Sequence, residues 1–390
     1  MAFSGINLEN VKLINRSSIL MLLNAHGSLS RKDIATSLGL TPAAVTQICS
    51  ELIEKKIIKE IGELSEESRV GRKKILLEIN YEYSKVIAIT IEETETYIAL
   101  CKLNGKCIDS CVIVTDINVS PKDFCEKIAD SVCFLMKKNK LKKEDFLGLG
   151  VSIPGIVQKE SGKSLHAYRI WDKEVDLKEL LIPLTKLPVV VENNVKAFTQ
   201  AELMFGSGRT QDKLLFIKWG PGVGAAYSES KTNALLKSVR SVELGHVITQ
   251  KNGILCRCGR KGCLETKVST HAIAERVREK CNIPNVRAEN INEWITKKNS
   301  DLDLVLKEAC DELARTVVNI FTILEPNTIA VYGKIFLYPE VEKMFIALCH
   351  KYDSNIKENQ IVISPLADKF SYIGSCAVAI NEFFINKSCL

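Results

Sequence analysis

The chain has 390 residues, of which 46% are hydrophobic and 26% charged, a composition typical of a globular protein. Its 14 cysteines are too few for a small disulfide scaffold, and no uninterrupted apolar run reaches membrane-spanning length. The first residues lack the features of a secretory signal, so we expect a cytoplasmic protein with reduced cysteines and no membrane partner. The net charge of +6 gives only weak support for a polyanionic partner.

The first 54 residues have the pattern of three helices. Apolar residues recur at helical spacing from Leu8 to Ala25. A second helix is predicted after Ser30, which has an acid three residues later, and a third after Thr41, with proline at its first position. In a helix-turn-helix, the N-terminus of the third helix reads base edges in the major groove. The predicted DNA contacts of this region are Arg31, Thr41, Pro42, Ala43, Ala44, Thr46 and Gln47.

Residues 57–79 are predicted to form a β-hairpin wing. Two apolar runs, 57–61 and 73–79, flank a polar loop that carries a basic cluster. Arg69, Arg72 and Lys73 of this cluster suit a narrow minor groove or phosphate groups. A protein-interaction module with a solvated basic loop is the alternative. The helix order, the caps and the basic wing together favour double-stranded operator DNA.

The sequence pattern changes from Lys85 onward, where predicted strands alternate with helices in an α/β pattern. The first three strands are connected in part by a hairpin turn at Asn104-Gly105. The predicted strands are 86–91, 96–103, 106–114, 146–153, 188–191, 214–219 and 326–332, and the predicted helices are 121–140, 269–281, 302–324 and 371–384.

Residues 243–265 contain four side chains that suit tetrahedral Zn²⁺, namely His246, Cys256, Cys258 and Cys263. Such a shell leaves no open position, so the metal is expected to be structural. The alternative is that these are ordinary buried cysteines. The same stretch contains Glu243 and Glu265, whose carboxylates, once the loop is fixed, can accept hydrogen bonds from the hydroxyls of a polyol.

The run E-L-G-H followed by C-R-C-G-R-K-G-C-L-E resembles the signature of the ROK family, the sugar kinases and repressors of bacteria. Further matches extend the resemblance over essentially the whole chain. Gly71-Arg72-Lys73 stands where the wing motif of ROK repressors ends, and the run 151–155 resembles the family's sugar-cleft loop. The resemblance implies a winged helix-turn-helix (1–80) and a two-lobed actin-like α/β body of the sugar kinase/ribonuclease H-like type. Its lobes would be 81–195 and 196–390, with the C-terminal helix returning to the first lobe.

The positions that carry phosphoryl transfer in ROK kinases differ in this sequence. The kinase turn D-x-G-G-T is similar in position to residues 90–94, where Glu92 and Glu93 now place negative charge that would repel phosphate. The kinase catalytic base is an aspartate at the position of Asn194, and an amide cannot accept that proton. A glycine loop at 220–226 resembles the phosphate loop but is a weak signal alone. We therefore expect no enzymatic activity.

The resemblance implies a sugar-responsive repressor that acts as a homodimer or tetramer. The sugar contacts that it implies are Asn193, Asn194, Glu243, His246 and Glu265. The two asparagines can equally cap the next helix, and Trp171 can either stack on a pyranose ring or pack in a core. Two alternatives remain: an active sugar kinase with a regulatory head, and a regulator whose effector is a protein.

Overall fold

The computed structural model describes residues 8–64, 74–230, 237–281, 283–288, 290–295 and 300–386. The chain divides into two compact units. The first comprises Met1–Phe205, Ser230–Ser238 and Lys369–Leu390, and the second comprises Gly206–Glu229 and Val239–Asp368. The division falls after Phe205, because helix α6 (Asn194–Phe205) packs within the first unit against helix α12 (Phe370–Ala379).

The N-terminal segment folds as three helices and a small antiparallel sheet of order β1-β3-β2. Side-chain caps set the helix starts: the Ser30 hydroxyl accepts from the Asp33 backbone N–H at 3.2 Å, and the Thr41 hydroxyl from that of Ala44 at 3.3 Å. We call this segment the head. Its elements are α1 (Leu8–His26), β1 (Leu29–Ser30), α2 (Arg31–Leu38), α3 (Pro42–Glu54), β2 (Ile58–Leu64) and β3 (Lys74–Ile79).

The rest of the first unit is built on a mixed five-stranded sheet of order β11-β7-β4-β5-β6. Strands β4 and β7 and strands β7 and β11 pair in parallel, while β4, β5 and β6 form an antiparallel meander. A small sheet, β10-β9-β8, follows β7. The elements are β4 (Lys85–Ile91), β5 (Glu95–Lys102), β6 (Cys107–Val114), α4 (Pro121–Lys138), β7 (Phe146–Ile153), β8 (Ile156–Gln158), β9 (Lys163–His166), β10 (Val175–Asp176), α5 (Leu177–Thr185) and β11 (Val189–Asn193).

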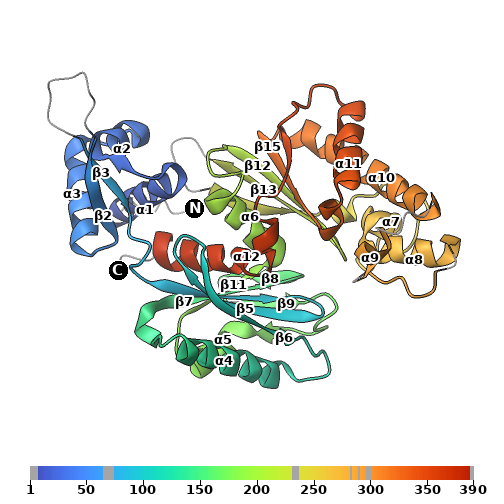
Figure 1. Cartoon of the computed structure of the whole chain (residues 1–390), viewed down its shortest axis with the longest axis horizontal. Coiled ribbons are helices and arrows are strands. Elements are labelled where there is room, and N and C mark those ends of the chain that lie inside the picture. The colour runs from blue at the N-terminus through green and yellow to red at the C-terminus, as the bar shows by residue number, and fades with distance from the viewer. Residues whose placement is uncertain are drawn as a thin grey trace, which may run out of the picture. The chain divides into compact units, whose positions relative to one another are not determined.

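Both faces of this sheet are covered, which explains why β4 is apolar along almost its whole length. Ile87 and Ile89 pack in one apolar cluster with residues of α4 and α5. Val86 and Ala88 point to the opposite face and pack in a second cluster with residues of α12. Figure 1 shows α4 and α5 on one side of the sheet and the red α12 on the other.

Helix α12 approaches β7 very closely. A Cβ added to Gly150 would lie 2.1 Å from the carbonyl oxygen of Ser375, so only glycine fits there. The Ser375 hydroxyl lies 2.7 Å from those of both Thr90 and Ser152, and all three residues are buried. This network joins the helix to β4 and β7. The chain continues from α12 into a π-helix, η5 (Ile380–Asn386).

The head packs on this side of the first unit. One apolar cluster contains Ile19 and Leu52 of the head together with Val86 of β4 and Phe384 of η5. Two hydrogen bonds from α1 add to this contact: the Ser17 hydroxyl donates to the Ile385 carbonyl at 2.8 Å, and the Asn24 amide donates to the Met204 carbonyl at 2.8 Å. The head therefore rests on the C-terminal ends of both α6 and η5.

The second unit has its own five-stranded sheet, of order β14-β13-β12-β15-β16, in which β12, β15 and β16 run parallel. In its core, strand residues such as Trp219 pack with residues of α8, α10 and α11. The elements are β12 (Lys213–Trp219), β13 (Val223–Ser230), β14 (Lys237–Val242), α7 (Glu265–Val268), α8 (Thr270–Cys281), α9 (Ile291–Ile295), α10 (Ser300–Leu324), β15 (Thr328–Tyr332), α11 (Pro339–Tyr352) and β16 (Ile361–Ile363).

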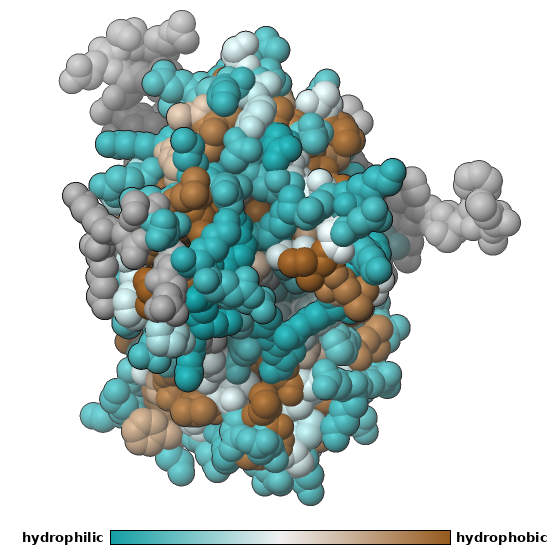
Figure 2. Space-filling view, turned by 90° about the vertical axis from the view of Figure 1, so that its right-hand side faces the viewer, coloured by the Kyte–Doolittle hydropathy of each residue, from teal (hydrophilic) through white to brown (hydrophobic). Residues whose placement is uncertain are grey.

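The surface is polar over most of the face drawn in Figure 2, where apolar residues form small separate groups. Among the residues that the structure describes, no helix combines the length and the apolar character needed to cross a bilayer.

Candidate functional site

His246, Cys256, Cys258 and Cys263 converge in the second unit, with their ligand atoms all within 4.8 Å of one another. Cys256 Sγ lies 3.6 Å from His246 Nδ1, and Cys258 Sγ lies 3.6 Å from Cys263 Sγ. A tetrahedral ion with Zn–S bonds of about 2.3 Å and a Zn–N bond of about 2.0–2.1 Å implies ligand separations of roughly 3.6–3.8 Å. The four residues predicted from the sequence therefore form a cluster whose spacing fits a tetrahedral metal ion.

The loop that carries these ligands is a tight knuckle. The Cys256 N–H donates to the Arg260 carbonyl at 2.7 Å, and the Gly259 N–H donates back to the Cys256 carbonyl at 2.9 Å. Gly262 has a φ of +78°, and a Cβ there would lie 1.8 Å from the Gln250 carbonyl oxygen. Glycine at position 262 therefore allows the segment that leads into Cys263 to pass close to residue 250. Cys256 and Cys263 are buried, whereas Cys258 is exposed.

Glu265 lies directly after the knuckle, and its carboxylate is held by the glycine loop. Its Oε2 atom accepts from the Val223 N–H at 3.0 Å. A Cβ added to Gly245 would lie 3.3 Å from the same oxygen, so the 243–246 turn passes beside it. Glu243 begins this turn, where its carbonyl accepts from the His246 N–H at 2.9 Å, and its side chain is exposed. Carboxylate, metal ligands and glycine loop thus form one contiguous site region within the second unit.

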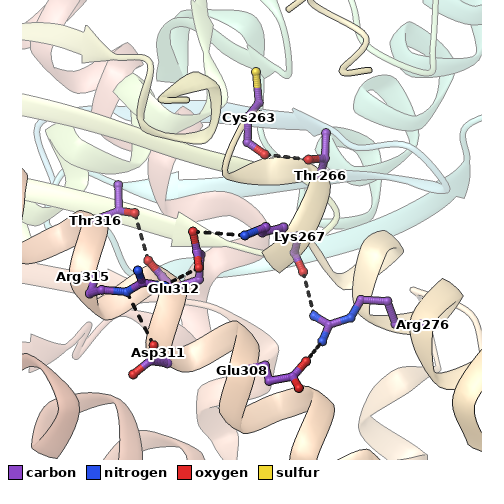
Figure 3. Close-up of polar contacts among 9 residues, drawn as sticks. All are labelled: Cys263, Thr266, Lys267, Arg276, Glu308, Asp311, Glu312, Arg315 and Thr316. Atoms are coloured by element: carbon purple, nitrogen blue, oxygen red, sulfur yellow. Dashed lines mark hydrogen bonds and ion pairs between the residues drawn. The ribbon is translucent and has the colours of Figure 1, made fainter. Parts of the chain in front are cut away.

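The short helix α7, which starts at Glu265, is anchored to its neighbours (Figure 3). The Lys267 ammonium lies 3.5 Å from the carboxylate of Glu312 on α10, which is also paired with Arg315. The Lys267 carbonyl accepts from Arg276 of α8 at 3.4 Å, and Arg276 forms an ion pair with Glu308. This network fixes the backbone that presents Glu265.

In the first unit, Asn193 caps helix α6. Its side-chain oxygen accepts from the N–H groups of Val195 at 3.0 Å and Lys196 at 3.1 Å. Its amide nitrogen donates to the Gly155 carbonyl at 2.8 Å, which ties the 154–155 loop to the helix start. The helix-cap interpretation of this asparagine is therefore confirmed, and one of its two amide hydrogens is already used within the protein.

Asn194 is buried, and its amide donates to the Glu92 carboxylate at 3.1 Å. Asn194 and the acidic turn at 90–94, which the sequence treats as separate features, thus contact each other. Glu192, just before this pair, is also buried, and its carboxylate accepts from the Asn193 N–H at 2.9 Å. Burial raises the pKa of the Glu192 carboxyl above its ordinary value.

Sequence reasoning missed the partner of Glu93. Arg169 lies beside it, with Nη1 3.3 Å from the Glu93 carboxylate. The Arg169 guanidinium therefore offsets negative charge in the 90–94 turn, which is less negative than the sequence suggested. The two residues are 76 positions apart, so no local pattern could have linked them.

Trp171 is a packing residue in this structure. Its side chain is only 6% exposed, and its ring meets that of Phe124 edge-on with centroids 5.7 Å apart. The packing alternative is the one that the structure favours over stacking on a sugar.

The predicted DNA-contact residues at the start of α3 are mostly exposed. Thr41, Pro42, Ala43, Thr46 and Gln47 are exposed, and Ala44 is partly buried. The Thr46 hydroxyl donates to the Pro42 carbonyl at 2.7 Å, and the Gln47 amide to Glu51 at 3.4 Å. Arg31 forms an ion pair with Glu60 of β2 at 2.9 Å. The wing residues Arg69, Arg72 and Lys73 lie outside the described residues.

Comparison with known proteins places these features in a family. A family model described as "ROK family" matches residues 86–382, and one described as "Winged helix-turn-helix DNA-binding" matches residues 14–59. The chain is 26% identical to the xylose repressor of Caldicellulosiruptor bescii, with 95% of this chain and 96% of that protein covered. It is 27% identical to the DNA-binding transcriptional repressor Mlc of Escherichia coli, covering 71% and 68% of the two chains.

Solved structures show the same fold. A ROK family transcriptional regulator, described as a homolog of E. coli Mlc, superposes with a TM-score of 0.77 at 23% identity, over 97% of this chain and 98% of the other. The glucokinase of Streptomyces griseus, solved with glucose and AMPPNP, gives a TM-score of 0.62 at 19% identity, over 75% and 98%. The predicted fold class, a winged helix-turn-helix followed by an actin-like body, is confirmed. Since the family model matches well over half of the sequence, this chain belongs to the ROK family.

Proposed function

We propose that this protein is a sugar-responsive transcriptional repressor, in which the head binds operator DNA and the body senses a sugar. The observation that carries the proposal is a winged helix-turn-helix joined to a ROK body. The sequence resemblance adds that Asn194, a buried amide, stands at the position of the kinase base. Relatives named as repressors, which align over nearly the whole chain, support the same function.

The proposed DNA contacts lie at the exposed N-terminus of α3 and in the wing. Thr41, Pro42, Ala43, Ala44, Thr46 and Gln47 would face base edges and the adjacent backbone. To contact DNA directly, Arg31 must exchange its ion pair with Glu60 for one with a phosphate. If it keeps the ion pair, it would only help to position the start of helix α2. Arg69, Arg72 and Lys73 would supply the salt-dependent share of the affinity.

We propose Glu243, His246 and Glu265 as sugar-recognition residues of the second unit, and Asn193 and Asn194 as those of the first. Carboxylate oxygens accept hydrogen bonds from hydroxyls, and Glu265 is already held by a backbone N–H and an anchored helix. His246 is a candidate metal ligand through Nδ1, so its role toward the sugar would be to orient the turn. Asn193 has one amide hydrogen left for a ligand after bonding Gly155.

We propose that the protein binds and releases the sugar without phosphorylating it. Phosphoryl transfer in this family's kinases needs a proton acceptor where Asn194 stands, and the amide donates to Glu92 there. Nucleotide phosphates would also meet the carboxylates of Glu92 and Glu93, which would repel them.

The metal is proposed to be a structural Zn²⁺ held by His246, Cys256, Cys258 and Cys263. The three soft thiolates and the imidazole favour zinc over harder ions. When bound, it would fix the knuckle and so the backbone at both Glu243 and Glu265.

Helix α6 is the proposed link between ligand and DNA. Asn193 caps its first turn, and Met204 near its other end accepts the hydrogen bond from Asn24 of the head. A ligand that favours one position of α6 would therefore bias the head. A homodimer or tetramer, acting in the cytoplasm, would carry two heads to a palindromic operator.

The proposal is tested with a panel of neutral sugars and sugar phosphates. Thermal unfolding of the full chain should shift upward for one sugar class, since a ligand at about a hundredfold its Kd adds about 2.7 kcal/mol. A coupled ADP assay with the same sugars should stay at background. Sugar-dependent ADP release would instead identify an active kinase with a regulatory head. The absence of any shift, together with a shift caused by a protein partner, would identify a protein effector.

A further inference from the structure

Two cysteines face each other across the β5–β6 pair of the first unit, far from the metal ligands in sequence. The register places Cys101 of β5 directly opposite Cys107 of β6, after a bulge at Leu100/Cys101. Directly opposed residues in antiparallel strands have Cα atoms about 4.5–5.5 Å apart. This lies within the range of about 4.4–6.8 Å that a disulfide requires. The register therefore pairs the two cysteines at a type of position whose usual backbone spacing suits a disulfide.

The two thiols have different surroundings. Cys101 is fully enclosed and packs in the apolar cluster that also contains Cys376 of α12 and Ile19 of the head. Cys107 is only partly buried, and its sulfur lies 3.5 Å from the Asp109 carbonyl. Cys107 is thus the more accessible residue of the pair, and Cys101 is enclosed in the core.

We propose that Cys107 and Cys101 form a peroxide-sensitive dithiol, in which Cys107 is oxidised first and Cys101 then closes an intrachain disulfide.

The electrostatics support this order. The hydrogen bond from Cys101 lowers the pKa of the Cys107 thiol to about 7, so that about half of it is thiolate at neutral pH. Burial raises the pKa of Cys101 well above its ordinary value, and burial also raises that of Cys111, the other partly buried cysteine of β6. Cys107 is therefore the better nucleophile of the three at neutral pH.

The chemistry balances with a hydroperoxide as the oxidant. The Cys107 thiolate attacks the distal oxygen, the O–O bond breaks, and the leaving alkoxide or hydroxide takes a proton from solvent, which leaves Cys107 as a sulfenic acid. The sulfur loses two electrons and the peroxide gains them. The Cys101 sulfur then attacks the Cys107 sulfur, the S–O bond breaks, and the departing hydroxide takes the Cys101 proton as water. Two thiols and one hydroperoxide thus give a disulfide, an alcohol or water, and one further water.

The test treats metal-loaded full-length protein with equimolar hydrogen peroxide, alkylates the remaining thiols and maps every cysteine peptide by mass spectrometry. We expect a linked 101–107 pair that has lost two hydrogens and is restored by dithiothreitol. Its formation should be about fivefold or more faster than oxidation of Cys111, because the larger thiolate fraction outweighs the lower intrinsic nucleophilicity. The oxidation state of Cys256, Cys258 and Cys263 is measured separately, from the peptides that contain them.

Three variants make the assignment specific. Cys101→Ser should accumulate a dimedone-reactive sulfenic acid at Cys107, because the resolving thiol is gone. Cys107→Ser should leave Cys101 reduced, and Cys376→Ser should still form the 101–107 link. Brief dimedone trapping in the unsubstituted protein gives the same information if the buried Cys101→Ser variant does not fold. A Cys107 that stays reduced while Cys111 or Cys133 is oxidised would overturn the proposal, and so would a link from Cys107 to Cys376.

Discussion

Asn194 and Glu92 stand where the sequence resemblance puts the catalytic base and the phosphate turn of ROK kinases, and in this structure they are paired. The Asn194 amide donates to the Glu92 carboxylate at 3.1 Å and so offsets part of the charge of the acidic turn. Arg169 does the same for Glu93. The turn is therefore a set of matched pairs, and its residues depend on one another.

Asn194→Asp would place two carboxylates in hydrogen-bond contact. We expect the variant to remain inactive with ATP and to lose about 1–3 kcal/mol of unfolding free energy at neutral pH, since a donor becomes a like charge at a buried position. Denaturant unfolding measures the loss, and a coupled assay measures the activity. Asn194→Asp combined with Glu92→Gln should regain most of the stability, because a donor is returned. Equal instability of the single and double variants would show that the pair does not matter.

Glu243→Ala removes one proposed hydroxyl acceptor from an exposed turn. Truncating a carboxylate that makes a charge-assisted hydrogen bond costs about 1.5–3 kcal/mol, or roughly ten- to hundredfold in sugar affinity. Operator binding should be unchanged, so the variant would repress without responding to the sugar. Titration calorimetry with the sugar that shifts the melting curve measures the effect. Glu229→Ala, which removes a partly buried acid on β13 of the same unit, is the control. Sugar affinity that survives Glu243→Ala would remove this residue from the site.

At the scale of elements, local signals in the sequence were enough for the parts that local chemistry determines. The caps at Ser30 and Thr41 predicted the helix starts of the head, and the cysteine spacing predicted the cluster of one histidine and three cysteines. The sequence could not give the pairing of Arg169 with Glu93 or the contact of Asn24 with Met204, because those partners are brought together only by the fold. Nor did it indicate that the predicted last helix becomes a π-helix at Ile380.

The knuckle is the element whose stability should depend most on metal. Cys258→Ser keeps the size of an exposed side chain but removes one thiolate of the cluster. We expect the purified variant to lose stoichiometric zinc, measured by elemental analysis, and to melt at a lower temperature. Cys133→Ser, at a partly buried position on α4 outside the cluster, is the control. Unchanged melting of metal-free protein would contradict a structural role for the ion.

Helix α1 donates hydrogen bonds to the body from the side chains of Ser17 and Asn24, in addition to its apolar contacts, and the coupling should weaken when these two side chains are shortened. Ser17→Ala combined with Asn24→Ala removes the hydrogen bonds to Ile385 and Met204. Each bond contributes about 0.5–1.5 kcal/mol, so we expect the sugar to change operator affinity about three- to tenfold less than in the parent protein. Sugar affinity itself should change much less. Asn80→Ala, which removes a bond from the wing to Lys56 within the head, is the control. An unchanged response in the double variant would exclude this route.

At the scale of the whole molecule, the head and the α/β part of the first unit share one hydrophobic core and are not joined by a linker alone. A single apolar cluster includes Ile34 of the head, Ala99 of the central sheet and Ile380 of η5. The sequence predicted a head and a body but not this shared core, because helical and strand periodicities show which face is apolar and not what covers it. A shared core makes it physically reasonable for a ligand event in the body to reach the head.

The central claim is that one protein couples sugar binding to operator binding without chemistry on the sugar. The direct measurement is fluorescence anisotropy with DNA selected from a random library by the full-length protein, recorded with and without the sugar that stabilises it. We predict that the sugar shifts the operator Kd by at least about tenfold, that ATP has no further effect, and that a chain beginning at residue 81 does not bind the DNA. An operator Kd that no sugar changes, or undiminished binding by the truncated chain, would contradict the account.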